Sequence, residues 1–110
     1  MHEVTHATFE QDVVAASREM PVLVDFWGPR CGPCIQMMPW VEKLAAERAD
    51  SVKVVKLNTA ENRRLSFDLL VMGLPAFALY RDGKEVQRLS GDDCTPAAIT
   101  RLLDSALAPS

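Results

Sequence analysis

The sequence predicts an α/β domain with a central mixed β-sheet of four to five strands, flanked by four helices. Three observations point to this fold class. Helix-like and strand-like segments alternate along most of the 110 residues. A strand–helix–strand order implies parallel neighbours, because the chain must cross over before the next strand can pair. The Asp82-Gly83 pair between two β-rich runs adds an antiparallel hairpin.

The first half of the chain predicts a helix, a buried strand and a long helix. Thr8 and Gln11 have the spacing of a capping box, which predicts a helix over Phe9 to Arg18. The nearly continuous apolar run from Val22 to Trp27 is typical of a strand covered on both faces. From Cys34 to about Ala49 the apolar residues recur at helical spacing. They form one face, made of Ile35, Met38, Val41, Leu44 and Ala45.

The middle of the chain predicts a second strand and a short helix. Residues 52–57 are rich in valine and typical of a strand. Asn58, with Glu61 three residues later, predicts the start of the next helix. That helix would carry Leu65, Leu69 and Leu70. A short strand near residues 3–5 would bring the sheet to five strands.

The last third predicts a β-hairpin followed by a helix. Residues 76–80 and 85–89 have strand-like composition and flank the Asp-Gly turn. Thr95 then serves as N-cap, with Pro96 at the first helical position. The apolar face of this helix is Ile99, Leu102, Leu103 and Leu107. No linker or repeat divides the sequence, so we expect a single domain over residues 1–110.

Composition and charge exclude several classes of protein. The net charge is −3, so no bulk positive field is present to hold nucleic acid or an anionic membrane. The longest apolar run is too short to span a bilayer, so we expect no membrane association. The first residues lack the basic and apolar segments of a signal peptide, which favours a cytoplasmic location. With only three cysteines, a close pair in a reducing compartment is expected to be catalytic or metal-binding.

The segment Cys31-Gly32-Pro33-Cys34 lies where the buried strand passes into the long helix. Two cysteines three apart in a first helical turn can bring their sulfurs together with little backbone movement. Cys31 is at or near the N-cap, where free N–H groups and the helix dipole favour a thiolate. We therefore expect Cys31 to be the nucleophile and Cys34, one turn further in, to be the resolving thiol. Gly32 keeps the sulfurs accessible, and Pro33 stiffens the turn.

Zinc binding is the alternative use of a close cysteine pair. A structural zinc site needs two further ligands, normally from a second paired motif. The remaining candidates are Cys94, His2 and His6, which have no such spacing. We therefore expect neither a metal nor another cofactor in the chain. Cys94 itself is interpreted as a small, partly buried residue, with a regulatory thiol as the alternative.

Four blocks of sequence carry a family resemblance. They are Val24-Asp25-Phe26-Trp27, Cys31 to Cys34 with Pro39 downstream, Val55-Lys56-Leu57-Asn58, and Gly73-Leu74-Pro75 before the hairpin. In their order and spacing these blocks resemble the thioredoxin family over nearly the whole chain. A lone C-x-x-C motif would be weak evidence, but the four blocks together are specific. The resemblance implies the thioredoxin fold and thiol–disulfide exchange.

The resemblance also implies roles for residues around the dithiol. Pro75 would be a cis-proline that faces the cysteines, and its loop would pair with an extended client segment. Asp25 would be a buried carboxyl of raised pKa that moves a proton to or from Cys34. An aspartate that reaches water at the end of the strand is the alternative. Lys56 on the neighbouring strand would pair with Asp25, unless it is a plain surface lysine.

A client-binding surface around Cys31 is a further implication. Its members would be Trp27, Arg30, Gly32, Pro33, Leu74, Pro75 and Gly91. Arg30 departs from the family, which usually has tryptophan there, and its guanidinium would favour the Cys31 thiolate. A solvated loop arginine is the alternative. Further departures, which put the usual reductase and clients in doubt, are Ile35, Ala60, Leu70, Met72 and Ala76.

We therefore predict a monomeric protein-disulfide reductase. Its clients would be disulfide-containing proteins, and by family analogy its electrons would come from an NADPH-dependent flavoprotein reductase. A thiol oxidase or isomerase of the same fold is one alternative. A thioredoxin-fold binding module whose thiols are dispensable is the other.

Overall fold

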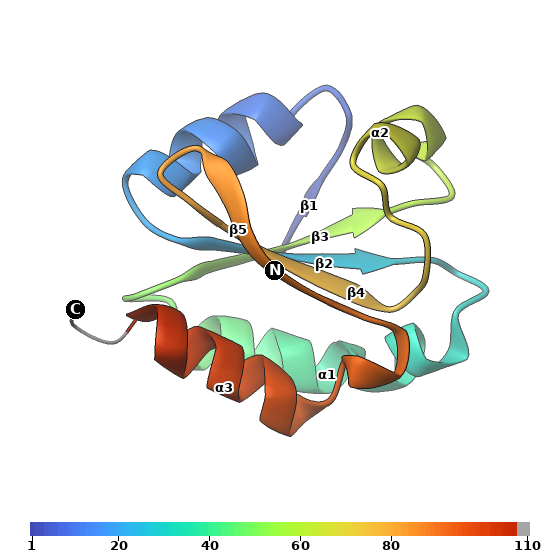
Figure 1. Cartoon of the computed structure of the whole chain (residues 1–110). Coiled ribbons are helices and arrows are strands. Elements are labelled where there is room, and N and C mark those ends of the chain that lie inside the picture. The colour runs from blue at the N-terminus through green and yellow to red at the C-terminus, as the bar shows by residue number, and fades with distance from the viewer. Residues whose placement is uncertain (108–110) are drawn as a thin grey trace.

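Five strands form one mixed sheet in the computed structural model, which describes residues 1–107 (Figure 1). Their order across the sheet is β1-β3-β2-β4-β5. Strand β3 pairs in parallel with β1 and β2, whereas β4 pairs antiparallel with β2 and β5. The predicted mixed α/β architecture is thereby confirmed. The strands are β1 (His2–Val4), β2 (Val22–Trp27), β3 (Lys53–Asn58), β4 (Ala76–Arg81) and β5 (Lys84–Ser90).

Helices cover both faces of this sheet. Figure 1 shows α1 and α3 beneath it, with the N-terminal helical segment and α2 on the opposite side. The helical elements are η1 (Glu10–Ala15), η2 (Ala16–Arg18), α1 (Gly32–Glu47), α2 (Arg63–Asp68), η3 (Gly91–Asp93) and α3 (Pro96–Leu107). None of the helices among residues 1–107 is long and apolar enough to cross a membrane.

Strand β2 is the middle strand of the sheet, and it contributes to both hydrophobic cores. Side chains alternate along a strand, so Val24 and Phe26 pack on one side and Leu23 on the other. The Leu23 core also contains Val41 and Leu44 of α1. By the same alternation, the side chain at position 25 belongs to the side that α1 and α3 cover.

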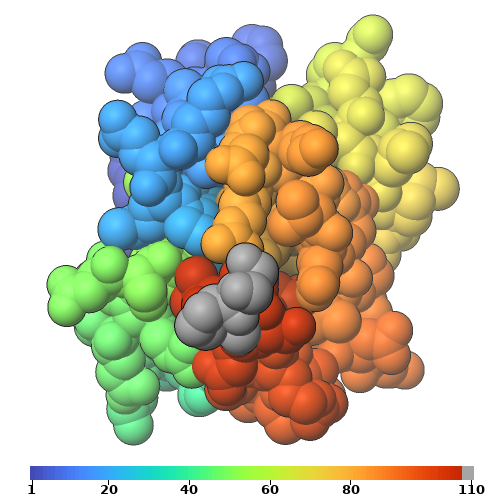
Figure 2. All heavy atoms as spheres, turned by 60° about the vertical axis from the view of Figure 1, so that its left-hand side comes forward, coloured from blue at the N-terminus to red at the C-terminus, as the bar shows by residue number. Residues whose placement is uncertain are grey.

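Strand β5 forms an exposed edge of the sheet. Figure 2 shows it at the surface between the N-terminal helical segment and α2. Arg88 of β5 donates hydrogen bonds to the carbonyls of Leu69 and Leu70, at 2.7 and 2.9 Å. These bonds tie the chain after α2 to the edge strand, and so help to fix the loop that leads into Pro75.

The helical segment predicted over Phe9 to Arg18 is present as η1 and η2, but the capping box at Thr8 and the helix start at Asn58 are wrong, for a shared physical reason. The Thr8 capping box does not form, because Thr8 Oγ1 accepts from the Thr5 N–H at 2.9 Å and the segment 10–18 folds as π-helical and 3₁₀ turns. Asn58 starts a turn rather than a helix, because its Oδ1 accepts from the Ala60 N–H at 3.0 Å. Short polar side chains bond to nearby backbone in several ways, and helix capping is only one of them.

Helix α2 is accordingly shorter than predicted. It begins at Arg63 and ends at Asp68, so Leu69 and Leu70 lie beyond it. Leu70 has a positive φ of 59° and is 67% exposed. Ile35 is a second correction: at 48% exposure it lies outside the apolar face of α1, whose buried members are Cys34, Val41 and Leu44.

The hairpin and the last helix follow the prediction. Asp82 and Gly83 have φ values of 56° and 87°, the left-handed pair that a tight two-residue turn requires. Thr95 Oγ1 accepts from the Ala98 N–H at 3.1 Å, which is the expected N-cap bond.

Candidate functional site: a disulfide at the start of α1

The two cysteines of the predicted motif are joined by a disulfide. The S–S bond is 2.08 Å long and the Cα atoms are 5.2 Å apart, so the structure shows the oxidised form. Strand β2 ends at Trp27, a short loop follows, and α1 begins at Gly32. This connection places the pair at the edge of the sheet where the parallel strands end (Figure 1). Cys31 is half-buried, whereas Cys34 is 2% exposed.

Cys31 is the N-cap of α1. Its Sγ accepts a hydrogen bond from the Cys34 N–H at 3.2 Å, and its carbonyl accepts from the Ile35 N–H at 3.1 Å. Pro33 occupies the first turn, where a missing N–H costs nothing. The sulfur therefore lies at the N-terminus of α1, where the Cys34 N–H and the helix dipole would stabilise negative charge on Cys31 once the disulfide is reduced.

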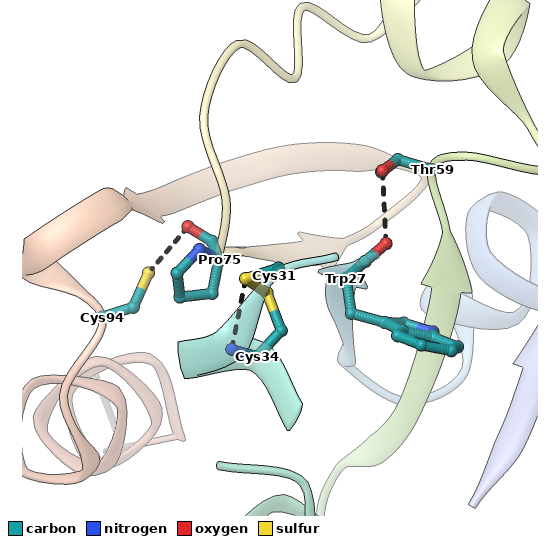
Figure 3. The surroundings of a disulfide bond; sticks show 6 residues. All are labelled: Trp27, Cys31, Cys34, Thr59, Pro75 and Cys94. Atoms are coloured by element: carbon teal, nitrogen blue, oxygen red, sulfur yellow. Dashed lines mark hydrogen bonds between the residues drawn. A yellow bond between two sulfur atoms is a disulfide. The ribbon is translucent and has the colours of Figure 1, made fainter. Parts of the chain in front are cut away.

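Pro75 lies beside the disulfide, between it and Cys94 (Figure 3). The Leu74–Pro75 peptide bond is cis, in agreement with the family resemblance. The Pro75 carbonyl accepts from the Gly91 N–H at 2.8 Å and from the Cys94 thiol at 3.3 Å. Gly91 has a φ of 59°, a conformation that glycine adopts without strain. Gly91 thus fixes the proline loop through its backbone.

The sequence left the role of Cys94 open between a buried residue and a regulatory thiol, and the structure favours the buried residue. It is 7% exposed, and the pKa of its thiol is raised to about 11, first by burial and then by the carboxylates of Asp25 and Asp93. A thiol with such a pKa is protonated at neutral pH, which disfavours the regulatory alternative. Its bond to Pro75 was missed, because no local pattern links residues 19 positions apart.

Asp25 is buried in the middle of β2. It is 2% exposed, and its Oδ1 has no hydrogen-bond partner among residues 1–107. Burial raises its pKa to about 7, against a smaller lowering by the positive charge of Lys56. The alternative of an aspartate that reaches water is therefore wrong, because β2 is covered on both faces.

Lys56 influences Asp25 across the sheet without forming an ion pair within residues 1–107. The two residues are register partners on β3 and β2. Lys56 Nζ lies 5.6 Å from the centre of the Trp27 ring, and the Trp27 indole N–H donates to Glu3 Oε2 at 2.9 Å. Sequence reasoning missed Glu3, whose place follows only from the pairing of β1 with β3.

Trp27 is also held through its backbone. Its carbonyl accepts from the Thr59 hydroxyl at 3.2 Å (Figure 3), and also from the Thr59 N–H at 2.9 Å. These bonds join the ends of β2 and β3 directly before the active-site loop. Trp27 therefore supports the loop from the sheet side, whereas the resemblance implies a place for it on the client-binding surface.

A groove adjoins Cys31 on the side of α2. Its volume is about 440 Å³. The predicted client-binding residues Arg30 and Leu74 line it, together with Gly28, Pro29, Cys31, Thr59, Ala60 and Arg63. Among the residues that the structure describes, no cluster of three or more His, Cys, Asp or Glu side chains is arranged to hold a metal ion.

Comparisons with known proteins agree with this geometry. The sequence model of the Thioredoxin family matches residues 1–105. Thioredoxin 1 of Synechococcus elongatus is 43% identical over 88 residues, which is 80% of each chain. The thioredoxin of Mycobacterium bovis is 37% identical over 102 residues, 93% of this chain and 86% of its own. The thioredoxin of Acetoanaerobium sticklandii is 35% identical over 103 residues, 94% of this chain and 96% of its own.

Proposed function

Because the chain belongs to the thioredoxin family, we propose that it reduces disulfide bonds in other proteins through Cys31 and Cys34. The observation that carries this proposal is the asymmetry of the pair. Cys31 is the more exposed residue of the pair, it lines the groove, and its Sγ accepts a hydrogen bond from a backbone N–H at the start of α1. Cys34 is buried behind it. Cys31 is thus placed to attack a client disulfide, and Cys34 is placed to resolve the mixed disulfide that forms.

The first step is attack by the Cys31 thiolate on one sulfur of a client disulfide. A mixed disulfide forms between Cys31 and the client, and the second client sulfur leaves as a thiolate that takes a proton from water. The backbone donors of α1 lower the cost of the Cys31 thiolate before the attack. In the family, the loop of the cis-proline pairs with the client, and Leu74 and Pro75 hold that place beside Cys31.

The second step is attack by Cys34 on the Cys31 sulfur. Cys34 must first lose its proton, and Asp25 is the base we assign to this transfer. With a pKa of about 7, Asp25 is divided between its two forms near neutral pH, as an efficient general base should be. The client leaves with two thiols, and the domain keeps the disulfide seen in the structure.

The cycle closes when a reductase returns two electrons to the Cys31–Cys34 disulfide. We assign this partner to the NADPH-dependent flavoproteins, by analogy with the family. We also propose a monomer in the cytoplasm, where the buried free thiol of Cys94 suits a reducing compartment.

Two serine variants test the assignment of the thiols. In an insulin-reduction assay coupled to a thioredoxin reductase, Cys31→Ser abolishes turnover, whereas Cys34→Ser accumulates mixed disulfides with the client. Cys94→Ser is the matched control, because it removes a thiol outside the disulfide. An active Cys31→Ser protein would refute the mechanism. The midpoint potential of the pair separates a reductase from an oxidase or isomerase.

A further inference from the structure

The groove beside Cys31 carries two exposed arginines. Arg30 comes from the loop that precedes Cys31, and Arg63 comes from the first residue of α2. Both line the same groove as Cys31, although 33 positions separate them in the sequence. The chain as a whole has a net charge of −3, so this local concentration of positive charge runs against the overall balance.

Neither groove arginine is neutralised by a carboxylate within residues 1–107. Arg48, Arg64 and Arg88 form ion pairs with acidic side chains, whereas Arg30 and Arg63 form none. The Nε of Arg63 donates only to the Ala60 carbonyl, at 3.3 Å.

The acidic residue nearest to Arg63 in the sequence is Glu61, which forms a hydrogen bond with another side chain. Glu61 Oε1 accepts from the Asn58 amide at 2.9 Å, and Glu61 does not line the groove. Ala60, which does line it, carries no charge. The two guanidinium groups therefore have hydrogen-bond donors to spare for a ligand.

We propose that this groove selects client disulfides that are flanked by a carboxylate, an inference that rests on the proposed reductase function. When a client sulfur reaches Cys31, the client residues next to its half-cystine enter the groove. An aspartate or glutamate there meets two guanidinium groups, whose planar donors match a carboxylate. The remaining lining is small or apolar at Gly28, Pro29 and Leu74, which leaves room for an extended main chain.

Single-turnover reduction of synthetic peptide disulfides tests this selection without a reductase partner. Each probe is a symmetric disulfide of a short peptide with one cysteine, and the neighbouring residue is Glu, Gln or Lys. The reduced protein is mixed with each probe, and the released peptide thiol is measured after acid quenching. Every rate is divided by the rate of the same probe with dithiothreitol, because a neighbouring charge also changes the reactivity of the disulfide itself.

We expect the normalised rate for the Glu probe to exceed that for the Gln probe by about threefold to tenfold at low salt, and the Lys probe to be slowest. The preference should shrink as salt rises to about 0.5 M, because exposed charges are screened over a few ångströms there. This salt arm uses the unaltered protein, so it does not depend on how any variant folds.

The double variant Arg30→Gln, Arg63→Gln should bring the Glu-to-Gln ratio close to one. A changed Cys31 thiolate in this variant would affect all probes alike, so the ratio isolates the groove. Arg101→Gln is the matched control, because it removes an exposed arginine of α3 that does not line the groove.

Equal rates for the Glu and Gln probes in the unaltered protein would overturn the inference while leaving the reductase function intact. A preference that survives in the double variant would also overturn it. Failure to reduce any probe would instead refute the proposed function, and the inference with it.

Discussion

Replacing Asp25 by asparagine should change how the stability of the protein depends on pH. Asp25 has an ordinary pKa of 3.8, which burial raises to about 7 in the folded chain. An acid whose folded pKa is raised favours folding most when it is protonated in both states, which is below pH 3.8. As the pH rises from there to about 7, the Asp25 carboxyl ionises in the unfolded chain but stays largely protonated in the folded chain. The free energy of unfolding therefore falls. Above pH 7 both forms are ionised and the loss is complete.

The size of this effect follows from the shift in pKa. A change from 3.8 to about 7 corresponds to about 4 kcal/mol in the free energy of unfolding. The Asp25→Asn variant has no such titration, so its stability relative to the unaltered protein should rise by about that amount between pH 4 and pH 8. The buried amide of asparagine adds a cost in stability that is the same at every pH. This cost cancels when the stability difference at pH 4 is compared with that at pH 8.

Denaturant unfolding of the oxidised protein between about pH 4 and pH 8.5 measures this difference, with circular dichroism as the signal. The oxidised form is used because the thiols of Cys31 and Cys34 then cannot titrate. Asp50→Asn, a change in an exposed turn, is the matched control and should preserve the original pH dependence. Parallel stability curves for Asp25→Asn and the unaltered protein would refute a buried carboxyl of raised pKa.

Two further predictions concern the support of the site and of the fold. Lys56→Met removes the positive charge that lowers the pKa of Asp25, so the pH at which the stability loss is complete should move upward, measured by the same unfolding series. An unchanged pH range would show that Lys56 has no electrostatic role. Thr95→Ala removes the N-cap bond to the Ala98 N–H and should cost about 1 kcal/mol of unfolding free energy, with Thr100→Ala inside α3 as the comparison.

The parts of the fold that follow from local chemistry could be predicted from the sequence. Asp82 and Gly83 must adopt positive φ, and few other residue pairs do so readily. Thr95 followed by Pro96 is typical of a helix start, with threonine as the N-cap and proline at the first helical position. Thr8 and Asn58 show the limit, because each had several backbone partners within reach. Which partner wins depends on the path of the chain, and that path is set by tertiary packing.

The candidate site likewise contains residues that could be predicted from the sequence and a contact that could not. Cys31 and Cys34 could be identified from their spacing and their position between a strand and a helix. Asp25 stood out because a carboxyl lay inside an apolar run. The contact of Trp27 with Glu3 could not be predicted, since it depends on which strand lies next to β3.

In the proposed mechanism, the redox chemistry and the choice of client depend on different sides of the active-site loop. Asp25 and Cys34 lie on the buried side of the active-site loop, where the low polarity of the interior sets the proton affinity. Arg30 and Arg63 lie on the exposed side, where salt screens their charge over a short distance. If the groove selects clients as proposed, a substitution there changes the attraction for a client and leaves the proton affinity of Asp25 to be set by burial. The groove could then depart from the family pattern while the dithiol and its carboxyl keep it.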